Sequence, residues 1–217
     1  MYQLPHPLTI LTTPSTKESF KNQVKKYVLN YWELKLRMMS TPLSSLKYFQ
    51  PSYMSLTRPH PLLTTAGSSP YEVVKARVQA LLLSGRYRTE LLCSKWSTNT
   101  GGYCCTPGCK GRNIKEDTEH ILLHCSSLAL TRTWLVSFTL KYSLSVPFLS
   151  EILLSMTQPN HTMFCQFLLD CSVIPQVIDL SQRHGKIVLH HLFKVTRTWC
   201  YSLHRDRLRL LGRWNPN

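Results

Sequence analysis

Six cysteine and histidine side chains lie within 22 residues near the middle of the chain, and these residue types bind transition metals. The segment reads Cys104-Cys105-Thr106-Pro107-Gly108-Cys109 and, after ten further residues, His120-Ile121-Leu122-Leu123-His124-Cys125. A structural zinc site needs four such ligands in a tetrahedron, and two close pairs joined by a loop supply them. The spacing predicts one structural zinc ion; the alternative is a loop of free cysteines with surface histidines.

The first ligand pair consists of Cys109 and either Cys104 or Cys105. The Thr-Pro-Gly sequence between them is typical of a turn. Such a turn folds the chain back, so that two sulfur atoms point inward. The spacing leaves the choice between Cys104 and Cys105 open.

The second ligand pair consists of His120 and Cys125. Five residues on an ideal α-helix separate two side chains by about 140°. We therefore expect Cys125 at the end of a helix, where the backbone can turn. His124 lies four residues from His120, shares its helical face and is the alternative ligand.

The acids between the two pairs do not favour a catalytic metal. A catalytic zinc keeps one position for water and normally has a glutamate nearby as general base. Glu119 directly precedes His120, which is the wrong geometry, and four protein ligands fill the coordination sphere. We expect Glu116, Asp117 and Glu119 to form a solvated loop, and we name no catalytic residue.

The remaining cysteines have other expected roles. Cys93 is too far upstream to be a first choice as ligand, while Cys165, Cys171 and Cys200 lie in apolar stretches typical of small core residues. The clustered cysteines, and an N-terminus without the pattern of a signal peptide, predict a reducing compartment. The expected location is nuclear or cytoplasmic rather than secreted.

The charge of the chain is strongly positive and unevenly distributed. There are 26 Lys and Arg against 11 Asp and Glu, a net charge of +15. Residues 1–60 contribute +6, residues 61–182 contribute +2 and residues 183–217 contribute +7. Such basic ends favour a polyanion, with nucleic acid as the commonest and an anionic membrane surface as the rival. No stretch reaches the ~18 apolar residues of a membrane span, so the expected partner is RNA or DNA and not a membrane.

Apolar residues at helical spacing predict a mostly α fold. A basic helix over 15–38 has Ser15 and Glu18 in the positions of a capping box, and a Ser/Thr/Pro-rich extended stretch over 39–69 follows it. A second helix is expected between Ser69 and Gly85, with Pro70 in its first turn and Glu72 completing another capping box. The expected buried side of this second helix consists of Val74, Val78, Leu81 and Leu82.

Further helices are expected near 127–142, 148–156, 161–171 and 186–210. The chain is thus interpreted as three parts. These are a basic N-terminal helix and extended linker over 1–66, a zinc-binding module over 67–142, and a helical C-terminal tail with a basic end over 143–217.

The last helix divides into an apolar arc and basic positions. The arc consists of Leu189, Leu192, Phe193, Trp199, Cys200 and Leu203. Cations and an aromatic side chain near this end could contact phosphates and stack on bases. These candidate nucleic-acid contacts are Lys186, Lys194, Arg197, Arg205, Arg207, Arg209, Arg213 and Trp214. Arg207 falls on the apolar side, near an end where fraying would tolerate it.

The cluster from Cys104 to Cys125 resembles the terminal zinc-binding motif of non-LTR (LINE-type) retrotransposon reverse transcriptases. The stretch from Ser44 to Trp96 resembles the region just before that motif. The segments FCQFLLDCSVIPQVI and RTWCYSLHRDRLRLLGRW are similar to the ends of such polyproteins. The resemblance covers roughly residues 40–217 and implies that Cys104, rather than Cys105, is the first ligand.

The chain departs from the family in the acids that a polymerase needs. Polymerase chemistry requires carboxylates that hold two metal ions, yet the four aspartates are widely separated and include no Asp-Asp pair. The resemblance thus implies an accessory module that binds RNA or DNA, has no enzymatic activity and acts with a reverse transcriptase in trans. The alternatives are a relic fragment without function and a zinc-dependent nuclease.

Overall fold

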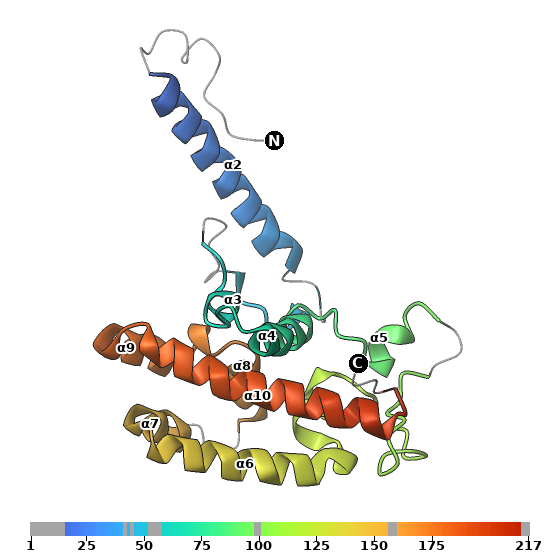
Figure 1. Ribbon diagram of the computed structural model, residues 1–217. Coiled ribbons are helices and arrows are strands. Elements are labelled where there is room, and N and C mark those ends of the chain that lie inside the picture. The colour runs from blue at the N-terminus through green and yellow to red at the C-terminus, as the bar shows by residue number, and fades with distance from the viewer. Residues whose placement is uncertain are drawn as a thin grey trace. The chain divides into compact units, whose positions relative to one another are not determined.

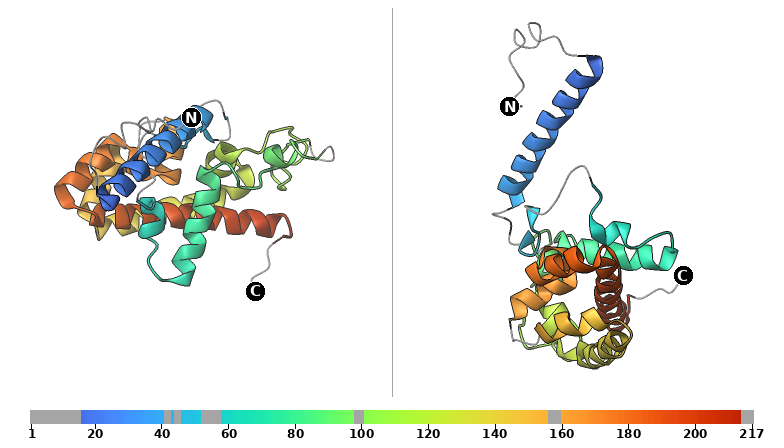
Figure 2. Two further views of the ribbon diagram at one scale, coloured as in Figure 1. Left: turned by 90° about the horizontal axis from the view of Figure 1, so that it is seen from above. Right: turned by 90° about the vertical axis from the view of Figure 1, so that its left-hand side faces the viewer.

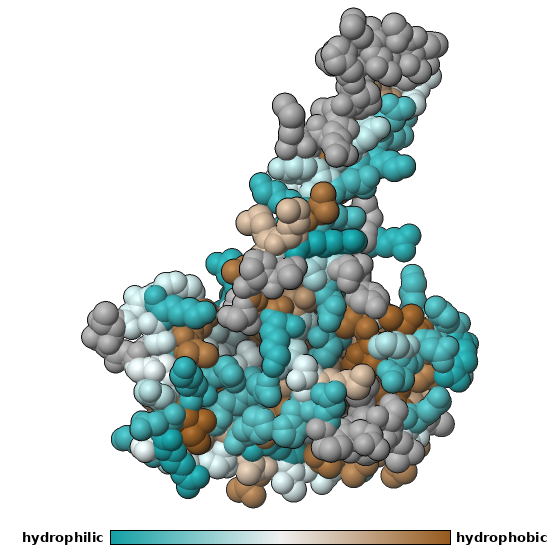
Figure 3. Space-filling view, turned by 180° about the vertical axis from the view of Figure 1, so that it is seen from behind, coloured by the Kyte–Doolittle hydropathy of each residue, from teal (hydrophilic) through white to brown (hydrophobic). Residues whose placement is uncertain are grey.

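The computed structural model describes residues 16–40, 43, 46–51, 58–97, 101–155 and 160–213. The chain divides into two units, Met1–His60 and Pro61–Asn217. The predicted cap Ser15, parts of the Ser/Thr/Pro-rich stretch and Trp214 lie outside the described residues. The first unit contains helix α2 (Lys17–Ser40), close to the helix predicted over 15–38, and hydrophilic side chains cover much of it (Figure 3).

The described chain is mostly helical, as the sequence predicts (Figure 1). The second unit contains, in chain order, α3 (Pro61–Thr64), α4 (Pro70–Leu83), α5 (Glu90–Cys93), the π-turn η3 (His120–His124), the 3₁₀ turn η4 (Ser126–Leu128), α6 (Ala129–Leu144), α7 (Pro147–Ser155), α8 (His161–Leu169), the 3₁₀ turn η5 (Cys171–Val173), α9 (Pro175–His184) and α10 (Ile187–Leu210). Within the described ranges there is no strand, although Tyr103 and Lys115 form an isolated antiparallel bridge.

Helix α10 is the central element of the second unit. It packs against α4, α6, α8 and α9, and its C-terminal part also contacts the turns η3 and η4. Helix α6 runs alongside it in Figure 1, and α4 crosses it in the left view of Figure 2. The predicted apolar arc of α10 supplies the core with Leu192, Phe193, Trp199, Cys200 and Leu203, all buried, while Leu189 is half-buried.

Helix α4 begins and ends where the sequence predicts, and Val78 and Leu82 are buried as predicted. Its cap and the rest of its buried side differ from the prediction. Ser69 is at the N-cap position without a side-chain hydrogen bond. Glu72 does not complete a capping box, because its carboxylate pairs with Lys75 at 2.7 Å and with Arg197 at 3.2 Å. Val74 is exposed and Leu81 is only half-buried. The buried side of α4 is instead partly polar, because it includes Gln79.

The hydrogen bonds of Gln79 explain why a polar side chain lies on the buried side of α4. Its amide nitrogen donates to the carbonyl oxygens of Leu168 at 2.6 Å and Leu169 at 3.2 Å, and to the hydroxyl of Thr196 at 3.0 Å. These bonds satisfy buried polar groups at the end of α8 and on α10. One fully buried amide therefore joins three helices, an arrangement that hydrophobic periodicity does not reveal.

Helix α9 lies between the helices predicted near 161–171 and 186–210, where no helix is predicted. Pro175 occupies its first turn, where a missing N–H costs nothing, and Gly185 ends it with a φ of 77°. The predicted module over 67–142 and tail over 143–217 both lie within the second unit. None of the described helices is long and apolar enough to cross a membrane.

Candidate metal centre

The chain reaches the first cysteine through a short antiparallel pairing. The N–H of Cys104 donates to the carbonyl of Ile114 at 2.8 Å, and the N–H of Glu116 donates to the carbonyl of Gly102 at 2.9 Å. These bonds close a loop that runs from Cys104 to Ile114 and contains both cysteines of the first ligand pair. They hold Cys104 at the base of the loop with its side chain in the interior of the module.

A turn over Thr106–Cys109 then reverses the chain, as the Thr-Pro-Gly sequence predicts. The N–H of Cys109 donates to the carbonyl of Thr106 at 3.0 Å. Gly108 lies against η4, where its N–H donates to the hydroxyl of Ser127 at 2.7 Å. A Cβ atom at position 108 would lie 2.8 Å from the hydroxyl oxygen of Ser126, so glycine permits this close approach.

The second pair is brought together by the π-turn η3. The N–H of Cys125 donates to the carbonyl of His120 at 2.7 Å, five residues earlier. A π-turn holds about one residue more than an α-turn, so residue i+5 lies nearly above residue i. Cys125 follows the turn with an extended ψ of 113°. This is the backbone departure at a helix end that the five-residue spacing predicts.

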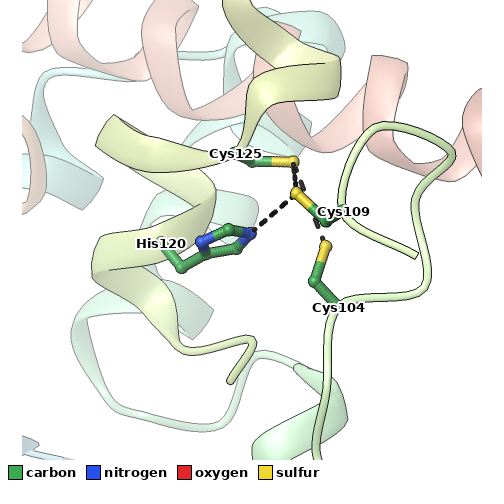
Figure 4. A group of neighbouring side chains, drawn as sticks. All are labelled: Cys104, Cys109, His120 and Cys125. Atoms are coloured by element: carbon green, nitrogen blue, oxygen red, sulfur yellow. Dashed lines mark hydrogen bonds between the residues drawn. The ribbon is translucent and has the colours of Figure 1, made fainter. Parts of the chain in front are cut away.

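The four predicted ligands meet in the interior (Figure 4). Cys104, Cys109, His120 and Cys125 are each exposed by no more than 4%. The sulfur of Cys125 lies 4.0 Å from that of Cys104 and 3.8 Å from that of Cys109. The sulfur of Cys109 lies 3.6 Å from Nε2 of His120. All eight cysteines are free thiols, so this proximity is not that of a disulfide.

These separations fit a tetrahedral zinc ion. Zinc bonds of about 2.3 Å to sulfur and about 2.0–2.1 Å to nitrogen place sulfur atoms about 3.8 Å apart, and sulfur and nitrogen about 3.5–3.6 Å apart. The donor set of three thiols and one imidazole is one that structural zinc sites use. Four buried protein ligands leave no coordination position for water. The residues therefore fit a structural metal ion.

The pKa shifts differ between the thiols of the cluster. Burial raises the pKa of Cys104 to about 12. Burial also acts to raise the pKa of Cys109, but hydrogen bonds with Ser126, Thr106 and Cys125 outweigh it and lower this pKa to about 6. The hydrogen bond with Cys125 raises the pKa of His120, against the effect of burial. A cation would replace these proton-mediated contacts between ligands.

Thr106 is a member of the site that spacing did not identify. It is fully buried, and its hydroxyl lies 3.2 Å from the sulfur of Cys104 and 3.3 Å from that of Cys125. Hydrogen bonds from outer groups orient metal ligands and tune their charge. Its position inside the predicted turn was the available signal, because serine and threonine hydroxyls often turn back onto neighbouring groups.

The loop between the two ligand pairs was expected to be solvated, but its Glu116 is buried and joins it to α10. This carboxylate is fully buried and accepts two hydrogen bonds from Arg207 of α10, at 2.9 Å and 2.6 Å. It also accepts the N–H of Glu90 at 2.7 Å, at the start of α5. Asp117 is exposed and accepts the N–H of His120 at 2.7 Å, while Glu119 is half-buried.

The two alternative ligands lie outside the cluster. Cys105 is exposed, and its thiol donates to the carbonyl of Tyr103 at 3.4 Å. His124 has an exposed side chain beside Glu119 and the ring of His161. Cys93 is half-buried, while Cys165, Cys171 and Cys200 are buried in the helical core as predicted.

Two of the predicted nucleic-acid contacts are buried, which overturns that role for them. Arg197 is 1% exposed and bonds to Thr65 and Glu72, while Arg207 is 2% exposed and bonds to Glu116. Helical spacing places Arg197 at the flank of the apolar arc, and its ion pair with the half-buried Glu72 holds it in the interior. Arg207 lies within α10, and its side chain is held in the interior by Glu116.

The other predicted contacts keep at least part of their surface. Arg205 and Arg209 both pair with Asp206, and Arg213 pairs with Glu90 at 3.3 Å. Lys186 and Lys194 are exposed. The last predicted contact, Trp214, lies outside the described residues.

Comparisons with protein-family models, with curated proteins and with solved structures found no match to this chain.

Proposed function

We propose that the chain is a zinc-stabilised module that binds RNA or DNA and has no catalytic centre of its own. The observation that carries the proposal is the buried Cys104–Cys109–His120–Cys125 cluster with the ligand separations of a zinc ion. A second support is the resemblance to the terminal zinc-binding motif of LINE-type reverse transcriptases, which implies the same four ligands. A reverse transcriptase in trans is the proposed protein partner.

The charge of the metal loop, residues 110–119 between the two ligand pairs, supports nucleic acid as the ligand. Lys110, Arg112 and Lys115 are exposed, and none has an ion-pair partner among the described residues. The buried acids Glu90 and Glu116 are already paired with arginines of the C-terminal part of the chain. The surface of the loop thus has these three cations against the exposed Asp117 and the half-buried Glu119, an excess of positive charge that favours binding to phosphates.

The metal part of the proposal is tested by comparing two neighbouring cysteines. Cys109→Ser removes a buried ligand, whereas Cys105→Ser changes an exposed thiol in the same loop. The expected result is one zinc per chain in the wild type and in Cys105→Ser. Cys109→Ser should lose more affinity than the about 10- to 100-fold that removal of an outer-shell partner costs. Elemental analysis and native mass spectrometry measure the ratio.

The nucleic-acid part is tested by two triple variants with the same change of charge. One carries Lys110→Gln, Arg112→Gln and Lys115→Gln. The other carries Lys141→Gln on α6, Lys186→Gln at the residue before α10 and Lys194→Gln on α10. We expect the loop variant alone to weaken binding to a single-stranded oligonucleotide. The slope of log K against log salt should become shallower by about 2, since each lost phosphate contact contributes about 0.7.

Fluorescence anisotropy over a range of salt concentrations measures both the affinity for the oligonucleotide and its dependence on salt. Equal losses in the two triple variants would mean that net charge alone drives association, and a larger loss in the second would place the surface on the C-terminal helix. A wild-type chain with bound zinc that shows no salt-dependent binding would contradict nucleic-acid binding itself.

A further inference from the structure

A second group of metal-ligating side chains lies beside the first. Oε1 of Glu119 is 3.8 Å from Nε2 of His124, and the ring centroids of His124 and His161 are 5.0 Å apart. One ligand atom from each of the three residues lies within 4.8 Å of the other two. None of the three takes part in the buried cysteine cluster.

The π-turn explains why these side chains meet. Glu119 and His124 are five residues apart, as are His120 and Cys125, and the two pairs are displaced by one residue along the same turn. The geometry that places Cys125 above His120 thus also places His124 beside Glu119. The first pair points into the module, whereas the second pair lies at the surface.

Helix α8 supplies the third side chain at a fixed position. His161 is its first residue, and the side chain of Asn160 caps the helix by accepting the N–H of Met163 at 3.2 Å. The helix also packs against the π-turn η3. His161 is therefore held near the turn by secondary structure, although its own side chain is exposed.

The chemistry of the three side chains is that of a zinc site with an open position. Two imidazoles and one carboxylate are ligands that divalent zinc and its neighbours in the first transition row accept. Ligand atoms about 2.0–2.1 Å from such an ion lie about 3.4 Å from one another, slightly closer than the 3.8 Å of the Glu119–His124 pair. His124 is 44% exposed at its side chain, so rotation about side-chain bonds can close this difference.

We infer that Glu119, His124 and His161 form a second, exchangeable binding site for a divalent transition metal such as Zn²⁺. Three protein ligands leave at least one coordination position, which faces solvent and takes water or an anionic ligand. Because the site contains no sulfur and lies at the surface, it binds metal more weakly than the buried cluster. Occupancy ties the π-turn to the start of α8.

The experiment counts metal ions in the full-length chain. The protein, with its first site filled, is dialysed to equilibrium against buffered Zn²⁺, and bound zinc is measured by elemental analysis. Two ions per chain are expected for the wild type, and one for His161→Ala. The control is His190→Ala, which removes an exposed histidine of α10 outside the group and should keep two. Loss of one of three ligands should weaken the second site by at least about 10-fold.

The absorption spectrum of bound Co²⁺ distinguishes the two sites. Glu119→Gln serves as a second variant in case His161→Ala does not fold. Co²⁺ bound to thiolates gives an intense sulfur-to-metal charge-transfer band, and Co²⁺ bound to imidazole and carboxylate gives only weak visible bands. We expect the wild type to bind a second equivalent of Co²⁺ without added charge-transfer intensity. We expect Glu119→Gln not to bind this second equivalent. A wild type that holds one ion, or a His161→Ala protein that still holds two, overturns the inference. Absence of the charge-transfer band from the first equivalent contradicts the proposed function instead.

Discussion

The hydroxyl of Thr106 lies close to two ligand sulfur atoms, 3.2 Å from that of Cys104 and 3.3 Å from that of Cys125. Among the described residues, no other hydroxyl lies this close to two of the ligands. When these sulfurs are thiolates, the hydroxyl can donate to one of them and reduce the repulsion between like charges. The side chain is completely buried, so no water can take its place. Its contribution should therefore be measurable as metal affinity.

Thr106→Val keeps the shape of this side chain and removes its hydroxyl. Zinc affinity should fall by about 10- to 100-fold, the usual effect of removing an outer-shell hydrogen bond, while the helical content is retained. Competition with a chromophoric chelator measures the affinity. Thr64→Val, at an exposed position on α3, is the matched control, and equal affinities for the two variants would contradict the role of Thr106.

The pH dependence of metal binding follows from the protonation of the free ligands. In the metal-free chain the pKa of Cys104 is about 12 and that of His120 is raised, so both hold protons that zinc must displace. Since binding releases protons, zinc affinity should rise with pH. It should fall steeply as the pH drops toward and below about 6, the pKa of Cys109. Chelator competition at several pH values checks this sign, and a flat profile would contradict thiolate ligation.

At the scale of elements, the pair between Glu116 and Arg207 joins the metal loop to the last helix. Arg207 donates to both carboxylate oxygens, and burial of this pair leaves neither side chain accessible to water. Burial acts to lower the pKa of Arg207, but hydrogen bonds and charge interactions with Glu116 and Tyr87 together outweigh it and raise this pKa, so the guanidinium stays charged. The pair is a structural link, which is why Arg207 is not free to contact phosphates.

Arg207→Met should lower the free energy of unfolding by about 3–5 kcal/mol, because it leaves the Glu116 carboxylate buried without its partner. Urea denaturation followed by circular dichroism measures the loss. Adding Glu116→Gln removes the uncompensated charge and keeps an acceptor for the N–H of Glu90, so the double variant should recover a large part of the stability. Arg205→Met, which breaks a partly exposed pair with Asp206, should cost about 0–1 kcal/mol.

Local sequence signals predicted most helices and the four clustered side chains, because periodicity, prolines, glycines and ligand spacing act over a few residues. They predicted the burial of Val78 and Leu82 on α4 but not that of Gln79, since its amide nitrogen bonds to groups about 90 residues away. The burial of Glu116 was missed for the same reason, since its partner is 91 residues away. Helix α9 was missed because Pro175 was not recognised as a first-turn proline.

At the scale of the whole molecule, internal pairing determines where the positive charge remains available. In the second unit, the acids Glu72, Glu90, Glu116 and Asp206 all pair with cations of α4 or of the C-terminal part of the chain. The C-terminal segment, with the highest charge per residue in the sequence, thus uses several of its arginines internally. The metal loop, in the nearly neutral middle of the sequence, keeps its exposed cations.

The second unit should fold without the first. Its helices pack around α10, and the bonds of Gln79, Arg197 and Arg207 all join residues of Pro61–Asn217. A fragment of residues 61–217 should bind one zinc at the buried cluster and melt cooperatively, as measured by circular dichroism with and without a chelator. A fragment that stays unfolded with zinc present would show that residues before Pro61 complete its core.

The π-turn has a consequence for how this segment can change in length. The separation between His120 and Cys125 and the separation between Glu119 and His124 are both set by the same stretch of backbone. Deleting Leu123 would convert both five-residue intervals into four-residue intervals, the spacing of an ordinary α-turn. No insertion or deletion between His120 and His124 can alter one interval and leave the other as it is, so the inner and the outer pair can change their spacing only together.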